Sequence, residues 1–225
     1  MARLFKNQPV VDAGNLVLSS SELHDYTYWQ MFYGCTYLTT PPKKLPATTL
    51  AAGCYREMFK GCSSLNTPPI LPATTLAASC YRAMFSGCAF TVAPTLPATT
   101  LASYCYYYMF ENCTSLTYTQ NELPATTLAS YCYQRMFTGC TSLTTAPALP
   151  ATTLASNSYY QMFNGCTSLN YVKCLATDIS ASNYTSYWLK SVASSGTFVK
   201  PASMTSWTTG TSGIPSGWTV QTASS

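Results

Sequence analysis

The residues that could carry out nucleophilic chemistry are few and lie near the start of the chain. His24 is the only histidine, it stands next to Asp25, and Cys35 is the first cysteine. A thiol nucleophile needs a base within hydrogen-bond reach, but Cys35 belongs to a column of cysteines that recurs at regular spacing. The column favours a structural thiol, so we predict no catalytic residue. A cysteine-dependent enzyme stays a third hypothesis, which would require a hydrolase activity that Cys35→Ser abolishes.

Metal and cofactor chemistry is equally sparse. The sequence has neither a CxxC nor an HExxH pattern, and one histidine is a poor start for a zinc site. No glycine-rich phosphate loop is visible, and the seven acidic residues are scattered along the chain. We therefore predict a protein that is not an enzyme and that binds no metal and no cofactor.

The eleven cysteines fall almost entirely into two columns. The first column contains Cys54, Cys80, Cys105 and Cys132, the second contains Cys35, Cys62, Cys88, Cys113, Cys140 and Cys166, and Cys174 belongs to neither. If the segment between the columns is helical, they lie about 12 Å apart within a repeat, which is too far for a disulfide bond. We expect reduced, buried thiols that pack as small hydrophobic groups, which favours assembly in an intracellular or anaerobic setting.

The columns follow from an internal repeat. The hexapeptide LPATTL begins at Leu45, Leu71, Leu96, Leu123 and Leu149, and degenerate copies begin at Leu18 and Leu175. Self-similarity at a fixed period of this length is typical of repeat proteins whose units stack in one direction. We predict a repeat domain of six repeats and a degenerate seventh at 18–189, between an N-terminal arm at 1–17 and a C-terminal cap or docking module at 190–225.

Each repeat predicts a turn, a helix and a strand. The proline of LPATT fixes φ, and threonine is a good helix N-cap. Leu50, Cys54, Met58 and Phe59 follow at the spacing of one helix face, and Gly61 stands where a helix C-cap needs left-handed geometry. The run Cys-Thr-Ser-Leu-Thr-Thr, stopped by proline, indicates a short strand.

Stacked strands of this kind would form a short parallel sheet with an inner and an outer column. The inner column is Leu38, Leu65, Phe90, Leu116, Leu143 and Leu169. The outer column is Thr39, Asn66, Thr91, Thr117, Thr144 and Asn170. Variation between repeats is largest near Tyr118, Gln120, Asn121 and Glu122, and at Lys43, Lys44, Val92 and Tyr171. We predict a binding surface made of the outer column together with Tyr118 and Tyr171, because the exposed strand face of such repeats commonly binds partners.

The motif Met-Phe-x-Gly-Cys-Thr-Ser-Leu-Thr, followed by proline, resembles the BspA-type leucine-rich repeats over about Leu18–Leu189. The repeats are longer than the family's usual ones, and Met-Phe stands where Ala-Phe is commoner. The resemblance implies an α/β repeat fold: a leucine-rich-repeat solenoid with a short parallel β-sheet, short helices on the other face and a small C-terminal β cap. It also implies bacterial surface adhesins and binding modules without catalysis. The sequence also looks like those encoded by phages of gut Bacteroidetes, and this likeness implies a virion protein that carries repeats of the host-surface type.

The two ends depart from the repeat. GTFVK and GWTVQ predict short strands in 190–225, and Trp207 and Trp218 are expected to seal the last repeat, with a docking tail as the alternative. The arm is expected either to cap the first repeat or to reach a neighbouring subunit. The N-terminus has no pattern of a secretory signal, and no stretch approaches the roughly 20 apolar residues of a membrane span.

The composition bounds the partners. Only 8% of the residues are charged, so Thr, Ser, Asn and Tyr must cover the surface. The eighteen tyrosines either offer contact area or pack between repeats. The eleven Lys and Arg residues are scattered with no run longer than two, so we expect no nucleic-acid partner.

These observations predict a non-catalytic recognition or structural protein. We expect a phage virion component, on the virion surface at head or tail, that binds a host surface protein or glycan or other virion proteins through the repeat face. A homo-oligomer is left open. The alternative is a BspA-type adhesin at the bacterial cell surface. The threonine face also suggests an ice-binding protein, which Asn66, Asn170 and the tyrosine content disfavour.

Overall fold

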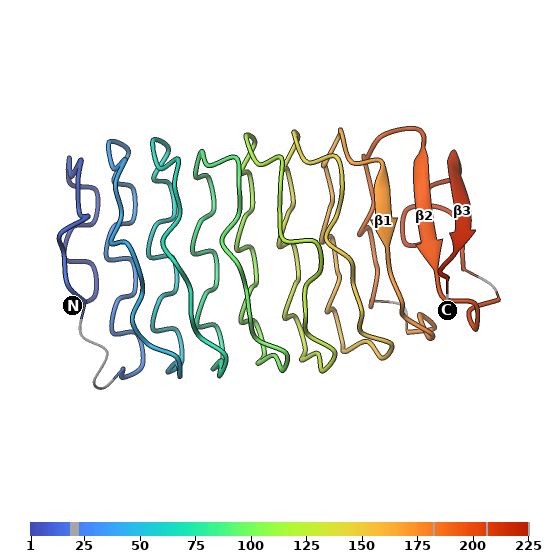
Figure 1. Cartoon of the computed structure of the whole chain (residues 1–225), viewed down its shortest axis with the longest axis horizontal. Coiled ribbons are helices and arrows are strands. Elements are labelled where there is room, and N and C mark those ends of the chain that lie inside the picture. Colours follow the sequence, from blue (N-terminus) through green and yellow to red (C-terminus); the bar gives the residue numbers. More distant parts are fainter. Residues whose placement is uncertain (19–22, 182, 206, 225) are drawn as a thin grey trace.

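The computed structural model describes residues 1–18, 23–181, 183–205 and 207–224. Successive repeats lie side by side along the longest axis of the molecule, and the two termini lie toward opposite ends (Figure 1). Neighbouring repeats are joined by isolated parallel bridges, such as Thr49 with Thr75 and Thr100 with Thr127. The repeat read from the sequence is therefore also the unit of the stack.

The described residues contain one small parallel sheet. Its strands are β1 (Tyr171–Lys173), β2 (Gly196–Lys200) and β3 (Trp218–Thr222), in the order β1-β2-β3. Val172 pairs with Phe198, which in turn pairs with Val220. The predicted parallel sheet is confirmed in this part of the chain, and so are the strands expected at GTFVK and GWTVQ.

The earlier repeats pair at single bridges rather than along strands. Val92 pairs with Tyr118, and Thr145 pairs with Tyr171 in β1, each two residues after the inner leucine or phenylalanine. Four of the six repeats place a proline one or two residues after this position, and proline has no N–H to donate to a sheet. The sixth repeat reads Leu-Asn-Tyr-Val-Lys-Cys without proline and forms a named strand. The fourth repeat, Leu-Thr-Tyr-Thr-Gln-Asn, also lacks proline there but pairs through Tyr118 at an isolated bridge.

The predicted helices are wrong, because the described residues contain no helix. The segment expected to be helical is instead a chain of tight turns. Met58 donates its N–H to the Tyr55 carbonyl (3.2 Å) in its own repeat, whereas Phe59 donates to the Met84 carbonyl (3.0 Å) in the next repeat. Alternate residues thus bond within a repeat and between repeats, which an α-helix cannot do because its N–H groups all bond within the helix.

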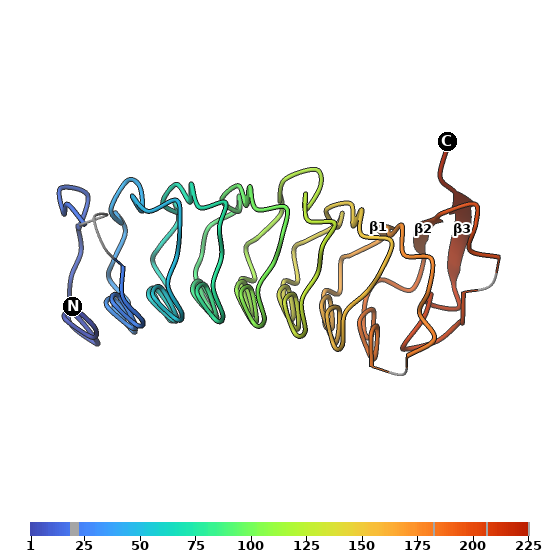
Figure 2. The ribbon, with the colours of Figure 1, turned by 90° about the horizontal axis from the view of Figure 1, so that it is seen from below.

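A left-handed residue recurs every four positions in these turns. In the second repeat Gly53, Glu57 and Gly61 have φ of 57°, 55° and 77°. The four-residue unit buries two adjacent side chains and turns the next two outward. We call this side of the molecule the turn ladder; it comprises residues 2–7, 25–34, 52–61, 78–87, 103–112, 130–139, 156–165 and 186–191. It lines the side of the molecule opposite the strands (Figure 2).

Stacked aromatic rings fill the core between the two sides. One column of stacked rings, with centroids 5.2–5.9 Å apart, is Phe5, Phe32, Phe59, Phe85, Phe110, Phe137 and Phe163. A second column, with centroids 5.6–6.1 Å apart, is Tyr28, Tyr55, Tyr81, Tyr106, Tyr133, Tyr159 and Trp188. Six of the eighteen tyrosines therefore pack between repeats, as one of the two interpretations predicted, and others lie on the surface.

All eleven cysteines are free thiols and all are buried, which confirms the prediction of buried columns. The distance of about 12 Å expected between the two cysteine columns assumed a helix, and the described residues contain none. The second column has a further role: each thiol donates to a phenylalanine carbonyl in the preceding turn segment, at 3.0 Å from Cys62 to Phe32 and 3.1 Å from Cys140 to Phe110. A small side chain with a weak donor fits this position better than a purely apolar one.

The two ends pack on the stack. The arm repeats the turn geometry: Phe5 donates its N–H to the Met31 carbonyl (2.9 Å) and stacks on Phe32. It therefore covers the first repeat. At the other end, Trp207 stacks on Trp188 with centroids 5.7 Å apart, and the Trp218 indole donates to the Ala193 carbonyl (2.8 Å). Both tryptophans thus pack at the last repeat, as predicted.

Candidate binding surface

The inner and outer columns lie as the sequence predicts. Every inner residue from Leu38 to Leu169 has 0% of its surface exposed, including Phe90 in place of leucine. The residues that follow them, Thr39, Asn66, Thr91, Thr117, Thr144 and Asn170, are all exposed. The predicted inside and outside of this face are therefore confirmed.

Backbone hydrogen bonds fix the outer column in place. Thr117 donates its N–H to the Thr91 carbonyl (2.9 Å) of the previous repeat, and its hydroxyl lies 3.2 Å from the same oxygen. Asn170 donates its N–H to the Thr144 carbonyl (2.9 Å) in the same way. Side chains held on a rigid backbone pay little entropy when a ligand binds.

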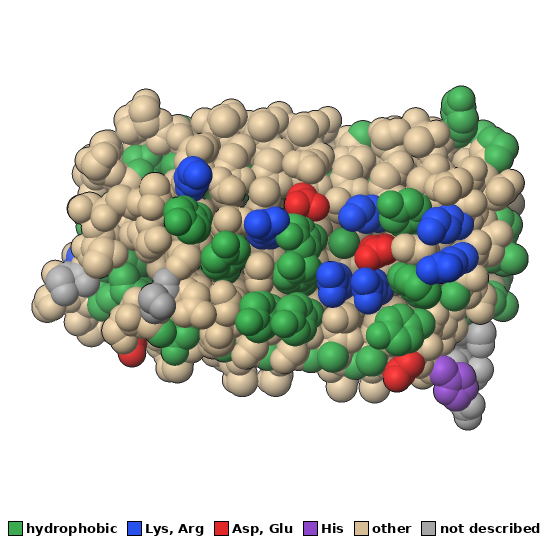
Figure 3. All heavy atoms as spheres, turned by 180° about the vertical axis from the view of Figure 1, so that it is seen from behind, with side chains coloured by type: hydrophobic (Ala, Val, Ile, Leu, Met, Phe, Trp, Pro, Cys, Tyr) green, Lys and Arg blue, Asp and Glu red, His purple; other side chains and the backbone are tan. Residues whose placement is uncertain are grey.

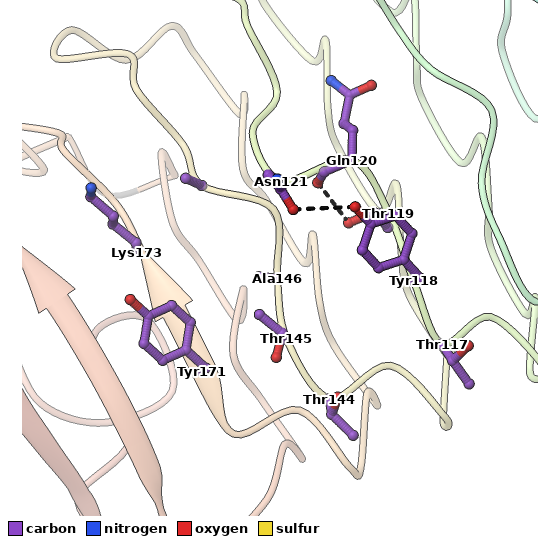
Figure 4. Close-up of a pocket in the computed structure, with 11 residues that line it drawn as sticks. Thr117, Tyr118, Thr119, Gln120, Asn121, Thr144, Thr145, Ala146, Tyr171 and Lys173 are labelled. Carbon is purple, nitrogen blue, oxygen red and sulfur yellow. Dashed lines mark hydrogen bonds between the residues drawn. The ribbon is translucent and has the colours of Figure 1, made fainter.

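A groove opens on this face between the fourth and sixth repeats (Figure 4). It has a volume of about 450 Å³, and its lining includes four of the eight predicted binding residues: Thr117, Tyr118, Thr144 and Tyr171. The other four predicted residues, Thr39, Asn66, Thr91 and Asn170, lie outside it. The structure thus gathers half of the predicted set into one concave site and leaves the rest along the flat face.

The groove exists because a small residue stands between two large ones. Tyr118, Thr145 and Tyr171 occupy the same position in three consecutive repeats, two residues after the inner leucine. Thr145 is the short member, and it bridges to Tyr171 in β1. Figure 4 shows Thr145 lying between the two tyrosines, with Thr144 beside it. The two rings rise on either side of a floor of threonine and alanine.

A longer connection in the fourth repeat forms the upper wall. The Gln120 side chain accepts a hydrogen bond from the Leu96 N–H (2.7 Å) and donates to the Glu122 carbonyl (2.6 Å). The Tyr118 hydroxyl lies 3.2 Å from the Asn121 amide oxygen (Figure 4). These bonds hold the loop and the Tyr118 ring in place, so the groove is largely formed before any ligand arrives.

The lining of the groove suits binding through hydrogen bonds and aromatic contact. It offers threonine hydroxyls, the amides of Gln120 and Asn121, the Lys173 ammonium and two tyrosine rings. Tyr118 is 52% exposed. The residues that line it include neither a carboxylate nor a cysteine nor a histidine.

Seven lining residues were missed as site residues: Thr119, Gln120, Asn121, Thr145, Ala146, Ala148 and Lys173. A signal for two of them was present, because Gln120 and Asn121 stand where the repeats differ most. Thr145 carried no such signal. It matches threonines at the same position in other repeats and matters here only because its neighbours in the stack are tyrosines.

The residues first considered for nucleophilic chemistry do not form a site. Cys35 is fully buried and donates to the Phe5 carbonyl (2.9 Å), and burial raises its pKa. His24 and Asp25 lie on the surface, where Asp25 accepts a hydrogen bond from the Ala52 N–H (3.1 Å). Within the described ranges there is no cluster of three His, Cys, Asp or Glu side chains that could hold a metal ion. None of the described residues forms a helix that could cross a membrane.

Comparison of the chain with protein-family models, with curated proteins and with solved structures gave no match.

Proposed function

We propose that the protein is a non-catalytic recognition protein, built as a leucine-rich-repeat solenoid, that binds its partner through the groove between Tyr118 and Tyr171. The one observation that carries this proposal is the groove itself. It combines two exposed aromatic walls with hydroxyl and amide groups that are held in place by bonds to the backbone.

The groove suits a partner on the surface of a host cell or a neighbouring virion protein. Aromatic rings and polar side chains that recognise without catalysis are typical of binding surfaces. The resemblance of the motif to BspA-type repeats favours a bacterial surface as the target and a phage virion as the place where the protein is displayed. A BspA-type adhesin on the bacterial cell surface is the alternative.

Binding to intact Bacteroidetes cells, measured by flow cytometry with the labelled protein, tests the groove. Tyr118→Ala removes one wall and is expected to weaken binding at least about tenfold, which corresponds to about 1.4 kcal/mol. Tyr37→Ala is the matched control, because Tyr37 is 63% exposed and lies outside the groove. Equal binding by the two variants, both with the unfolding midpoint of the parent protein, would refute the proposal.

The place of display is tested separately. Mass spectrometry of purified phage particles is expected to detect the protein. Its absence from the particles, together with an in-frame signal peptide upstream of the gene, would favour the adhesin instead.

A further inference from the structure

The turn ladder carries the net charge of the protein. Its segments contain seven of the eleven Lys and Arg residues and three of the seven acidic residues, which equals the whole formal charge of +4. The four cations and four acids outside it cancel. Figure 3 shows most of these cations gathered over the N-terminal part of this face, with aromatic and other apolar side chains between them. The basic residues of the ladder are Arg3, Lys6, Arg56, Lys60, Arg82, Arg135 and Lys190.

Six of the seven cations of the turn ladder, which form its basic face, lie over aromatic rings. The Arg3 guanidinium lies 4.1 Å from the centre of a Trp29 ring, and Arg82 lies 4.8 Å from that of Tyr107. Lys6 and Arg135 lie over other tyrosines in the same way, at 4.8 and 5.2 Å. Contact with an aromatic face stabilises a cation and leaves its outer side open to an anion.

A hydrogen-bonded network holds the first cations in register. Gln30 accepts from Arg3 (3.1 Å) and Lys6 (3.0 Å) through its amide oxygen, and its amide nitrogen donates to Glu57 (2.6 Å). Arg56 donates to the other oxygen of Glu57 (3.2 Å). The three cations are therefore ordered before binding, which lowers the entropic cost of holding an anionic ligand.

The charges along this face are spaced rather than continuous. Repeats with cations at Arg56 and Arg82 are followed by one that presents Tyr107, Tyr108 and Glu111, and then by one with Arg135. A nucleic acid carries a phosphate at every nucleotide and would bring some of its charges against Glu57 and Glu111. A polymer with acidic groups separated by uncharged rings matches this face better, because its neutral units can lie on the tyrosines.

We propose that the basic face binds an acidic polysaccharide, with carboxylate or sulfate groups at the arginines and sugar rings against the intervening tyrosines. This basic face is on the side of the molecule opposite the Tyr118–Tyr171 groove. The proposal made for it therefore does not depend on the function proposed for the groove.

Binding of the full chain to immobilised hyaluronate and to non-sulfated chondroitin, in both of which a carboxylated sugar alternates with an uncharged one, tests the proposal. The measurement is biolayer interferometry, with neutral dextran as the blank. We expect binding to both acidic polymers, none to dextran, and a loss of affinity as salt is raised from 50 to 300 mM. The double variant Arg82→Gln/Arg135→Gln is expected to lose at least tenfold in affinity. The control Lys43→Gln/Lys44→Gln removes the same charge from exposed positions outside the ladder and is expected to stay within twofold of the parent.

Further outcomes keep the test decisive. Arg82→Lys/Arg135→Lys restores the charges and is expected to recover most of the affinity; if the glutamine variant fails to fold, Lys6→Gln/Lys60→Gln replaces it. Equal losses in the ladder and control variants would overturn the proposal. So would tighter binding of a thirty-nucleotide oligo-dT or of phosphatidylserine vesicles than of either polysaccharide, because the face would then belong to a nucleic acid or a membrane.

Discussion

Replacing Ser79 by glycine is expected to stabilise the protein, because Ser79 has a φ of 56°. The left-handed conformation costs a residue with a side chain about 1–2 kcal/mol of stability, and glycine avoids this cost. Glycine is itself destabilising by about 0.5–1 kcal/mol, because it loses more conformational freedom on folding. The net gain is about 0.5–1 kcal/mol. The preceding repeat already has Gly53 at this position, with φ of 57°.

The sign of this change distinguishes a turn ladder from a helix. In a helix interior, glycine is less favourable than serine by about 0.5 kcal/mol, so the same substitution would destabilise the protein. Urea unfolding followed by circular dichroism measures the difference. Ala78→Gly is the matched control: Ala78 is the exposed neighbour without a positive φ, and its replacement is expected to cost about 0.5–1 kcal/mol. Equal destabilisation by both glycines would refute the turn geometry.

Three other predictions follow from the core. Leu143→Asp buries an unpaired charge and is expected to unfold much of the stack, whereas Thr144→Ala costs under about 0.5 kcal/mol; a urea melt that ranks them equally contradicts the two columns. Burial raises the pKa of the Cys62 thiol to about 12, so iodoacetamide at pH 8 is expected to label Cys62 in the unfolded chain but not in the native one. The buried thiols have a higher pKa in the folded protein than in the unfolded chain, where it is about 8.5. Their contribution to the free energy of unfolding is therefore constant below pH 8.5 and is expected to decrease from pH 9 toward 12. The urea midpoint of unfolding, measured in buffers of rising pH, checks this.

The repeat length and the two columns of the strand face were predictable from the sequence. Leu143 and Thr144 illustrate why: burial selects the residue type at one position and leaves its neighbour free, and the choice is repeated six times along the chain. Continuous strands were not predictable in the same way. Prolines such as Pro94 and Pro147 remove donors that a longer parallel ladder would use, so in those repeats pairing shrinks to isolated bridges.

The turn ladder was mistaken for a helix because the two have nearly the same period. Cys54, Met58 and Cys62 recur at four residues without drift. An α-helix advances about 100° per residue, so positions eight apart differ by about 80° around the helix and would not stay equally buried. All three are fully buried. Two features of the sequence indicate a four-residue turn. The buried positions recur without drift, and glycine stands near the start of the turn segment at Gly53 as well as at its end at Gly61.

The basic face escaped the sequence analysis for a related reason. Charges were compared along the chain, where Arg56 and Arg82 are 26 residues apart and no cluster is visible. In a stack of repeats, residues at the same position in successive repeats are neighbours on the surface. Two residues that are one repeat apart in the sequence can therefore lie side by side. The four arginines fall into two adjacent columns of the turn segments: Arg3 and Arg135 are themselves left-handed residues, and Arg56 and Arg82 each stand one position before such a residue. Charge in a repeat protein must therefore be read down the columns, and by that reading the net charge of this chain is concentrated on one side.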